Sequence, residues 1–157
     1  DGFLPVWCDP ERFDLFEAAI QAGLTTRDDM RREHFDILPS VTVNLGDDLP
    51  TCLNAFKPEL ALYIGGMGSR RKNYYKEFAS ELGFEAEAAR IQDLYLEGKK
   101  KEAIAAVPDS LVDAVTLSGP KERIAERLER WKQSGASTLV VSTSNPAALR
   151  LLAELVL

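Results

Sequence analysis

The sequence is poor in the residues from which metal and disulfide sites are built. Its 157 residues include two cysteines and one histidine. Cys8 and Cys52 are too few for a disulfide framework and lack the spacing of a zinc knuckle, so we expect buried free thiols in a reducing, cytoplasmic compartment. With His34 alone, a histidine-based zinc site is not predicted, and no Ser-His-Asp motif is present.

Long apolar runs and an excess of basic residues are also missing. No stretch of about 18 apolar residues occurs, so no membrane span is predicted. The formal net charge is −6, whereas a nucleic-acid surface needs Lys and Arg that outweigh nearby carboxylates. The mixed-charge stretch around Asp28, Asp29 and Arg31 is predicted to be solvated surface. What is present, 45% hydrophobic and 28% charged residues, is typical of one globular domain.

Strand-like and helix-like segments alternate at both ends of the chain. Residues 2–7 (GFLPVW) and 37–46 (ILPSVTVNLG) are predicted strands, and a helical pattern follows each. A third helical pattern over 118–135 leads into the apolar strand 137–144, which is typical of a strand buried on both faces. A last helix begins at Pro146. This order predicts three parallel strands with right-handed crossovers.

Polar residues, prolines and glycines mark the predicted helix ends. Pro10 suits the first position of the first helix, and Pro58 should kink or split the second. The expected N-caps are Asp9, Asp47 or Asp48, Ser118 and Asn145. The expected C-terminal glycines are Gly23 and Gly135.

Residues 69–117 have a helical pattern throughout. Tyr74, Phe78 and Leu82 recur at steps of four, which predicts a core position for Tyr74. The stretch PDSLVDAVTLSG (108–119) is predicted to be a short helix or a loop that leads into Ser118. We therefore interpret residues about 69–117 as a helical insertion in a single partial α/β domain that spans 1–157.

The segment ALYIGGMGSRRKNYY (61–75) has two interpretations. A phosphate cradle needs backbone N–H groups that converge at a helix start, and Ser69 with the basic residues after it would attract an anion. No GxxxxGK[ST] or GxGxxG pattern occurs, however. Alternatively, Gly65 and Gly66 end one helix in the left-handed conformation, Met67 packs, and Ser69 caps the next helix. The sequence leaves both interpretations open.

The predicted strands end in polar residues. Ser142 and Thr143 close the last strand, and Asn44 closes the strand before it. In α/β barrels the carboxyl ends of the strands carry the chemistry, and loops after the final strands often bind phosphate. The alternative role for 142–145 is a turn and N-cap for the last helix.

Three segments together resemble a known family. FLPVW, KPELALYIGGMGSRRKNYY and VPDSLVDAVTLSGPKERIAERLERWKQSGASTLVVST are similar to the C-terminal part of the luciferase-like monooxygenase superfamily. Within it, they most resemble coenzyme F420-dependent oxidoreductases of the methylenetetrahydromethanopterin reductase type. The resemblance covers essentially the whole chain. It implies a TIM (β/α)8 barrel of the bacterial-luciferase-like type, in which GFLPVW, ILPSVTVNL and TLVVST would be strands six to eight.

The resemblance also implies an activity. We expect hydride transfer between coenzyme F420 and an unidentified small organic substrate, with an FMN-dependent monooxygenase as the alternative. A second alternative is a non-catalytic fragment or subunit. Because the first five strands would be absent, and the chain starts at DGFLPVW without Met, the sequence predicts a chain cut from a longer one and lacking full activity. Exposed sheet edges would favour a homo-oligomer or pairing with the missing barrel half.

The resemblance places the cofactor at the strand ends and the glycine segment. F420 carries a phosphate and a polyglutamate tail, so the basic run 70–72 would have an anionic partner. No catalytic residue and no metal ligand is assigned from the sequence. The expected cofactor-binding residues are Tyr63, Gly65, Gly66, Met67, Ser69, Arg70, Asn73, Ser142 and Thr143.

Overall fold

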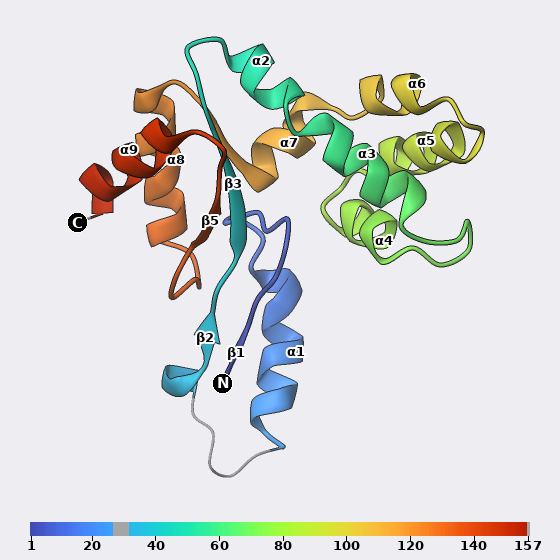
Figure 1. Ribbon diagram of the computed structural model, residues 1–157. Coiled ribbons are helices and arrows are strands. Elements are labelled where there is room, and N and C mark those ends of the chain that lie inside the picture. The colour runs from blue at the N-terminus through green and yellow to red at the C-terminus, as the bar shows by residue number, and fades with distance from the viewer. Residues whose placement is uncertain (27–31, 157) are drawn as a thin grey trace. The chain divides into compact units, whose positions relative to one another are not determined.

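The computed structural model describes residues 1–26 and 32–156. The predicted surface residues Asp28, Asp29 and Arg31 lie outside the described residues. The chain divides into two compact units (Figure 1). One contains Asp1–Asp47 and Ala114–Leu157, and the other contains Asp48–Asp113.

The first unit is built on a parallel sheet in which β3 lies between β4 and β5. Thr42 of β3 is paired with Thr116 on one side and with Ser142 on the other. A short parallel pair, β1 and β2, precedes this sheet and is linked to it by a bridge between Val6 and Ser40. The strands are β1 (Gly2–Phe3), β2 (Asp36–Ile37), β3 (Ser40–Leu45), β4 (Thr116–Gly119) and β5 (Val140–Ser142).

Helices cover one face of this sheet. Side chains alternate between the two faces of a strand, so Val41 and Val43 of β3 share a face, and with Leu117 of β4 they form one buried cluster with α8 and α9. Helix α8 contributes Ile124, Leu128 and Trp131 to this cluster, as its spacing predicts. The helices of the unit are α1 (Asp14–Leu24), a 3-10 turn η1 (Arg32–His34), α8 (Lys121–Lys132) and α9 (Pro146–Val156).

The second unit is helical. Helix α5 contacts α3, α4 and α6, and all the helices of this unit contribute buried residues. The helices are α2 (Leu49–Asn54), α3 (Lys57–Gly66), α4 (Tyr74–Glu81), α5 (Glu85–Leu96) and α6 (Lys100–Ala105). Helix α7 (Asp109–Val115) spans the boundary between the units.

Several predicted helix ends are confirmed. Asp48 caps α2 by accepting a hydrogen bond from the Thr51 N–H. Pro58 lies in the first turn of α3, and the predicted split separates α2 from α3. Asn145 precedes α9 and accepts from the Ala147 N–H at 3.0 Å. In each case a side-chain acceptor or a proline decides the boundary locally.

Other predicted ends are wrong. Asp9 accepts from the Glu11 and Arg12 N–H groups. Pro10 therefore lies in a turn with Glu11 and not at the first position of a helix, and α1 begins only at Asp14. Gly23 lies inside α1. Ser118 belongs to β4 and the N-cap of α8 is Pro120, while α8 ends before Gly135 is reached.

The strand predictions also need correction. Residues 116–119, predicted as the end of a helix or loop, form β4, so the described residues contain five strands rather than three. The predicted strand 37–46 is interrupted after Ile37, because Pro39 has no N–H to donate. The last strand is shorter than predicted and is not buried on both faces, since Val140 is 38% exposed. It lies at the sheet edge, where only β3 pairs with it among the described residues.

Candidate functional site

Gly65 and Gly66 make room for an aromatic ring of the neighbouring helix. A Cβ added to Gly65 would lie 2.3 Å from the Cβ of Tyr95, and one on Gly66 would lie 2.6 Å from Tyr95 Cε1. Both glycines are the last residues of α3. The predicted left-handed conformation is wrong, because neither is among the glycines of the described chain with positive φ. Their missing side chains let α5 pack closely on α3.

Asn73 connects the end of α3 to the start of α4. Its side chain is buried, with 3% of the residue exposed. Nδ2 donates to the carbonyls of Ile64 at 2.8 Å and Tyr63 at 3.1 Å, and Oδ1 accepts from the Lys76 N–H at 3.1 Å. Asn73, not Ser69, therefore caps α4. Its amide is used in holding the two helices together.

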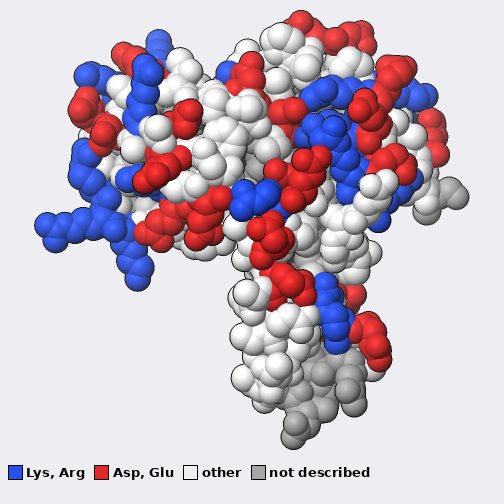
Figure 2. All heavy atoms as spheres, turned by 180° about the vertical axis from the view of Figure 1, so that it is seen from behind, with Lys and Arg blue, Asp and Glu red and all other residues white. Residues whose placement is uncertain are grey.

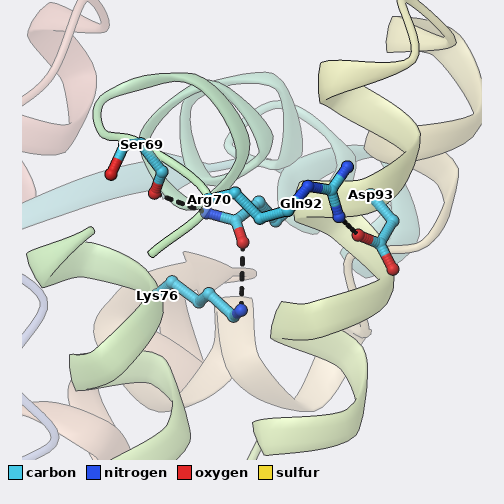
Figure 3. A network of polar contacts seen from close by, with 5 residues as sticks. All are labelled: Ser69, Arg70, Lys76, Gln92 and Asp93. Carbon is cyan, nitrogen blue, oxygen red and sulfur yellow. Dashed lines mark hydrogen bonds and ion pairs between the residues drawn. The ribbon is translucent and has the colours of Figure 1, made fainter. Parts of the chain in front are cut away.

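A buried glutamine fixes the turn between these helices. The Ser69 N–H donates to the Lys72 carbonyl at 3.0 Å, and the Lys72 N–H donates to Ser69 Oγ at 3.1 Å. Gln92 of α5 donates through Nε2 to the Ser69 carbonyl at 3.3 Å and accepts from Lys76 Nζ at 3.0 Å (Figure 3). The turn is therefore anchored to α5, and sequence reasoning missed Gln92 because it lies outside the glycine segment.

The basic side chains of this segment lie at the surface. Arg70 forms an ion pair with Asp93 of α5 (Figure 3). Its charge is thus partly neutralised within the protein. Met67 does not pack as predicted, since it is 53% exposed. On the face shown in Figure 2, Lys and Arg are interspersed with Asp and Glu.

Three tyrosines of the segment, Tyr63, Tyr74 and Tyr75, contact one another through their rings. Tyr63 meets Tyr75 edge to face, with ring centroids 4.6 Å apart. Tyr74 stacks on Phe78 at 6.0 Å, but it is 59% exposed, so its predicted core position is wrong. Tyr74 is the first residue of α4 and lies on the exposed side of the helix start, next to the buried Asn73.

In the first unit, polar side chains meet at the carboxyl end of the sheet. Asn44 of β3 donates through Nδ2 to Ser118 Oγ at 3.3 Å, and Ser118 Oγ lies 2.7 Å from Thr116 Oγ1. Thr116 and Ser118 are both buried. Sequence reasoning did not single out Thr116 and assigned Ser118 as a helix cap, although the apolar Leu117 between two hydroxyl residues is the period-2 pattern of a strand.

The turn after β5 is fastened to β3. Thr143 Oγ1 donates to the Val43 carbonyl at 2.8 Å and accepts from the Asn145 N–H at 3.1 Å. Asn145 Nδ2 in turn donates to the Leu45 carbonyl at 3.4 Å. Ser142, the last residue of β5, is exposed. The Thr143 hydroxyl thus has a structural role in positioning this turn.

Both cysteines are buried free thiols, and Cys8 is unreactive. Cys8 is buried in the cluster under the sheet, and burial, with a smaller contribution from Asp9, raises the pKa of its thiol to about 12. A thiol with such a pKa stays protonated and unreactive at neutral pH. In the described part of the chain, no three His, Cys, Asp or Glu side chains gather as metal ligands. Nor is any described helix long and apolar enough to cross a membrane.

Comparison with known proteins identifies the family. Residues 1–138 match the family described as luciferase-like monooxygenase. The chain belongs to the luciferase-like monooxygenase family. This confirms the resemblance drawn from the sequence. The match covers β1 to β4 and α1 to α8, including Asn73, Gln92, Asn44 and Ser118, and ends before Thr143.

Two relatives of this luciferase-like chain carry F420 in their names. A Mycobacterium tuberculosis protein named as a coenzyme F420-dependent oxidoreductase is 29% identical over 157 residues, which are 99% of this chain and 45% of that protein. The structure resembles that of the coenzyme F420-dependent tetrahydromethanopterin reductase from Methanopyrus kandleri, with a TM-score of 0.61 and 19% identity. That similarity covers 99% of this chain and 43% of the reductase. The chain spans less than half the length of either relative.

Proposed function

We propose that this chain is the carboxyl-terminal portion of a luciferase-like barrel enzyme that transfers hydride between coenzyme F420 and a small organic substrate. The family match over residues 1–138 carries the proposal. The names of the two relatives support the choice of cofactor. Because the chain covers 45% and 43% of them, strands supplied by the rest of the barrel would complete the pocket, and the chain alone is not expected to be active.

Several residues of the glycine segment are engaged in contacts within the helical unit. The space next to Gly65 and Gly66 is filled by Tyr95. Asn73 is hydrogen-bonded to backbone groups, and Arg70 is paired with Asp93. These contacts give Gly65, Gly66, Asn73 and Arg70 structural roles, so we propose the cofactor site at the sheet rather than in the segment 63–73.

The carboxyl end of the sheet fits a cofactor better. Ligands of α/β barrels bind at this end of the strands, and here Asn44, Ser118 and Ser142 place uncharged polar groups on β3, β4 and β5. When bound, F420 would supply the hydride carrier. The residues of this chain would orient it and keep water out.

Titration with cofactors tests the proposal. F420 fluorescence would be measured during addition of the 157-residue chain and, separately, of the complete natural protein that contains it. We expect saturable binding to the complete protein, and weak or no binding to the chain alone. Absence of F420 binding by the complete protein would contradict the proposed cofactor.

FMN is the alternative cofactor, because the family description names monooxygenases. The same titration with FMN distinguishes the two. Tighter binding of reduced FMN than of F420, together with oxygen consumption on its addition, would assign oxygen chemistry rather than hydride transfer.

Self-association is the remaining alternative. β5 has one edge without a partner strand in the described residues, and Val140 on it is 38% exposed. Such edges favour pairing with another chain. Light scattering after size exclusion would detect a dimer, whereas a monomer that melts cooperatively would exclude obligate pairing.

A further inference from the structure

The carboxyl end of β3 carries an oriented amide. Asn44 and Ser118 are direct partners in the parallel register of β3 and β4. Because Val43 packs under the helices, its neighbour Asn44 points to the opposite face of the sheet. There Nδ2 donates to Ser118 Oγ, and this hydroxyl is in turn hydrogen-bonded to Thr116. The amide is therefore attached to β4 through Nδ2.

The side-chain oxygen of Asn44, Oδ1, is available to accept a hydrogen bond from a ligand. Among the hydrogen bonds of the described residues, none uses Asn44 Oδ1. The residue is half-buried, and it lies one position before the end of β3, where β4 also ends at the register pair Leu45 and Gly119. With Nδ2 bound to Ser118, the amide presents an acceptor to whatever binds at this edge.

The charges close to this edge do not favour an anion as the bound group. The segments that end or follow the three strands, 38–48, 114–120 and 139–149, contain no Lys or Arg, and Lys121, the first residue of α8, forms an ion pair with Glu154 at 3.9 Å. They do contain Asp47, which is exposed and follows β3 directly. The Thr143 hydroxyl and the Asn145 side chain, which could otherwise hold a phosphate at the start of α9, are hydrogen-bonded to β3 and to the helix.

From these contacts we infer that Asn44 Oδ1 accepts a hydrogen bond from a neutral donor of the bound cofactor, a ring N–H or a side-chain hydroxyl, and that Ser118 is its positioning residue. The inference rests on the proposed F420 function and deepens it. It also replaces the expectation that this edge binds phosphate.

Substitutions of Asn44 distinguish a ligand that donates a hydrogen bond to this side chain from one that accepts a hydrogen bond from it. In the complete protein, Asn44→Ala is expected to raise the Kd for F420 about tenfold, since one hydrogen bond of about 1.4 kcal/mol is lost. Asn44→Asp keeps an acceptor, so its Kd should stay within about threefold of the unchanged protein. If the ligand offered a carbonyl or phosphate instead, Asn44→Asp would weaken binding more than Asn44→Ala, and the inference would be wrong.

Ser118 is tested through its coupling to Asn44. Ser118→Ala should weaken F420 binding in the unchanged protein but have no further effect when Asn44→Ala is already present. A purely structural role would lower affinity equally in both backgrounds. Thermal melts of all variants, with Asn44→Ser as a further variant that keeps an acceptor, separate a loss of folding from a loss of contact.

Two further probes identify the donor and its source. The deazaflavin ring without its side chain should lose affinity with Asn44→Ala by the same factor as F420 if the ring N–H is the donor. If only F420 is affected, the donor is a side-chain hydroxyl, and the inference also holds. Unchanged affinity of Asn44→Ala for both, or competition between inorganic phosphate and F420 that Asn44→Ala abolishes, would overturn it. Failure of the unchanged protein to bind F420 would instead contradict the proposed function.

Discussion

At the scale of single residues, Gly65 determines how closely α5 approaches α3. Gly65→Ala would place a Cβ 2.3 Å from the Cβ of Tyr95, and this clash involves atoms next to two backbones. We expect a loss of about 1 to 3 kcal/mol in the free energy of unfolding, the range typical of overpacking. Urea denaturation followed by circular dichroism would measure it.

Gly23 is the matched control. It also lies inside a helix, but a Cβ there would meet nothing within 4 Å. Gly23→Ala should leave stability unchanged or raise it by up to about 1 kcal/mol, because alanine is the better helix former. Equal effects of the two substitutions would show that Tyr95 does not occupy the space described.

Asn73 is expected to be the main polar contribution to the helical unit. Asn73→Ala removes the cap of α4 and leaves the Ile64 carbonyl without its donor, so we expect a loss of about 2 to 4 kcal/mol. Asn73→Ser keeps a capping oxygen and should cost clearly less. Chemical denaturation would compare them, and identical losses would mean that the cap contributes nothing.

Because Cys8 is buried, the stability of the first unit should depend on pH in the alkaline range. Its folded-state pKa of about 12 exceeds the ordinary value of 9.0, so between these pH values the unfolded chain loses the thiol proton first. Stability should therefore fall by about 1.4 kcal/mol per pH unit as pH rises from about 9 towards 12, and be unaffected below that window. Cys8→Ala should lack this part of the slope. Parallel profiles for the two proteins would refute the assignment.

At the scale of elements, the turn between β5 and α9 depends on Thr143. Thr143→Val keeps the shape of the side chain but leaves the Val43 carbonyl and the Asn145 N–H without partners, at an expected cost of about 1 to 3 kcal/mol. Thr138, which is exposed, provides the same substitution as a control, and Thr138→Val should change stability by less than about 0.5 kcal/mol. Thermal denaturation of both variants would measure the two losses, and equal losses would contradict a structural role for the Thr143 hydroxyl.

The helices were more predictable than the strands. Asp48, Pro58 and Asn145 act through neighbours in sequence, and their positions were predicted correctly. β4 was missed because four residues with two hydroxyl side chains, followed by a proline, resemble a capped helix start. Its strand character depends on pairing with β3, and that pairing is not local in the sequence.

The candidate site was likewise predicted where its signals are local in the sequence, and missed where they are not. The sequence indicated the family and the carboxyl ends of the strands as the polar edge. It could not show that Tyr95 fills the space beside two glycines, or that Gln92 holds the turn after them. These contacts join residues more than twenty positions apart, and only packing of α5 on α3 brings them together.

At the scale of the whole molecule, the helical unit is one continuous piece of chain. It has its own buried residues, including Leu60, Ile64 and Ile91. We expect the peptide 48–113 to be helical by circular dichroism and to unfold cooperatively, because its core is contained within it. A disordered peptide would show that the helices need the rest of the chain.

The strand order of the sheet has a consequence for how the protein folds during synthesis. β3 is made early, but Ser118 and Thr143, its contacts on the two sides, follow 74 and 100 residues later. Chains emerge from the ribosome amino end first. Apart from the bridge between Ser40 and Val6, both edges of β3 therefore stay unpaired while residues 48–113 are translated, so the helical unit can become compact before β4 and β5 pair with the central strand.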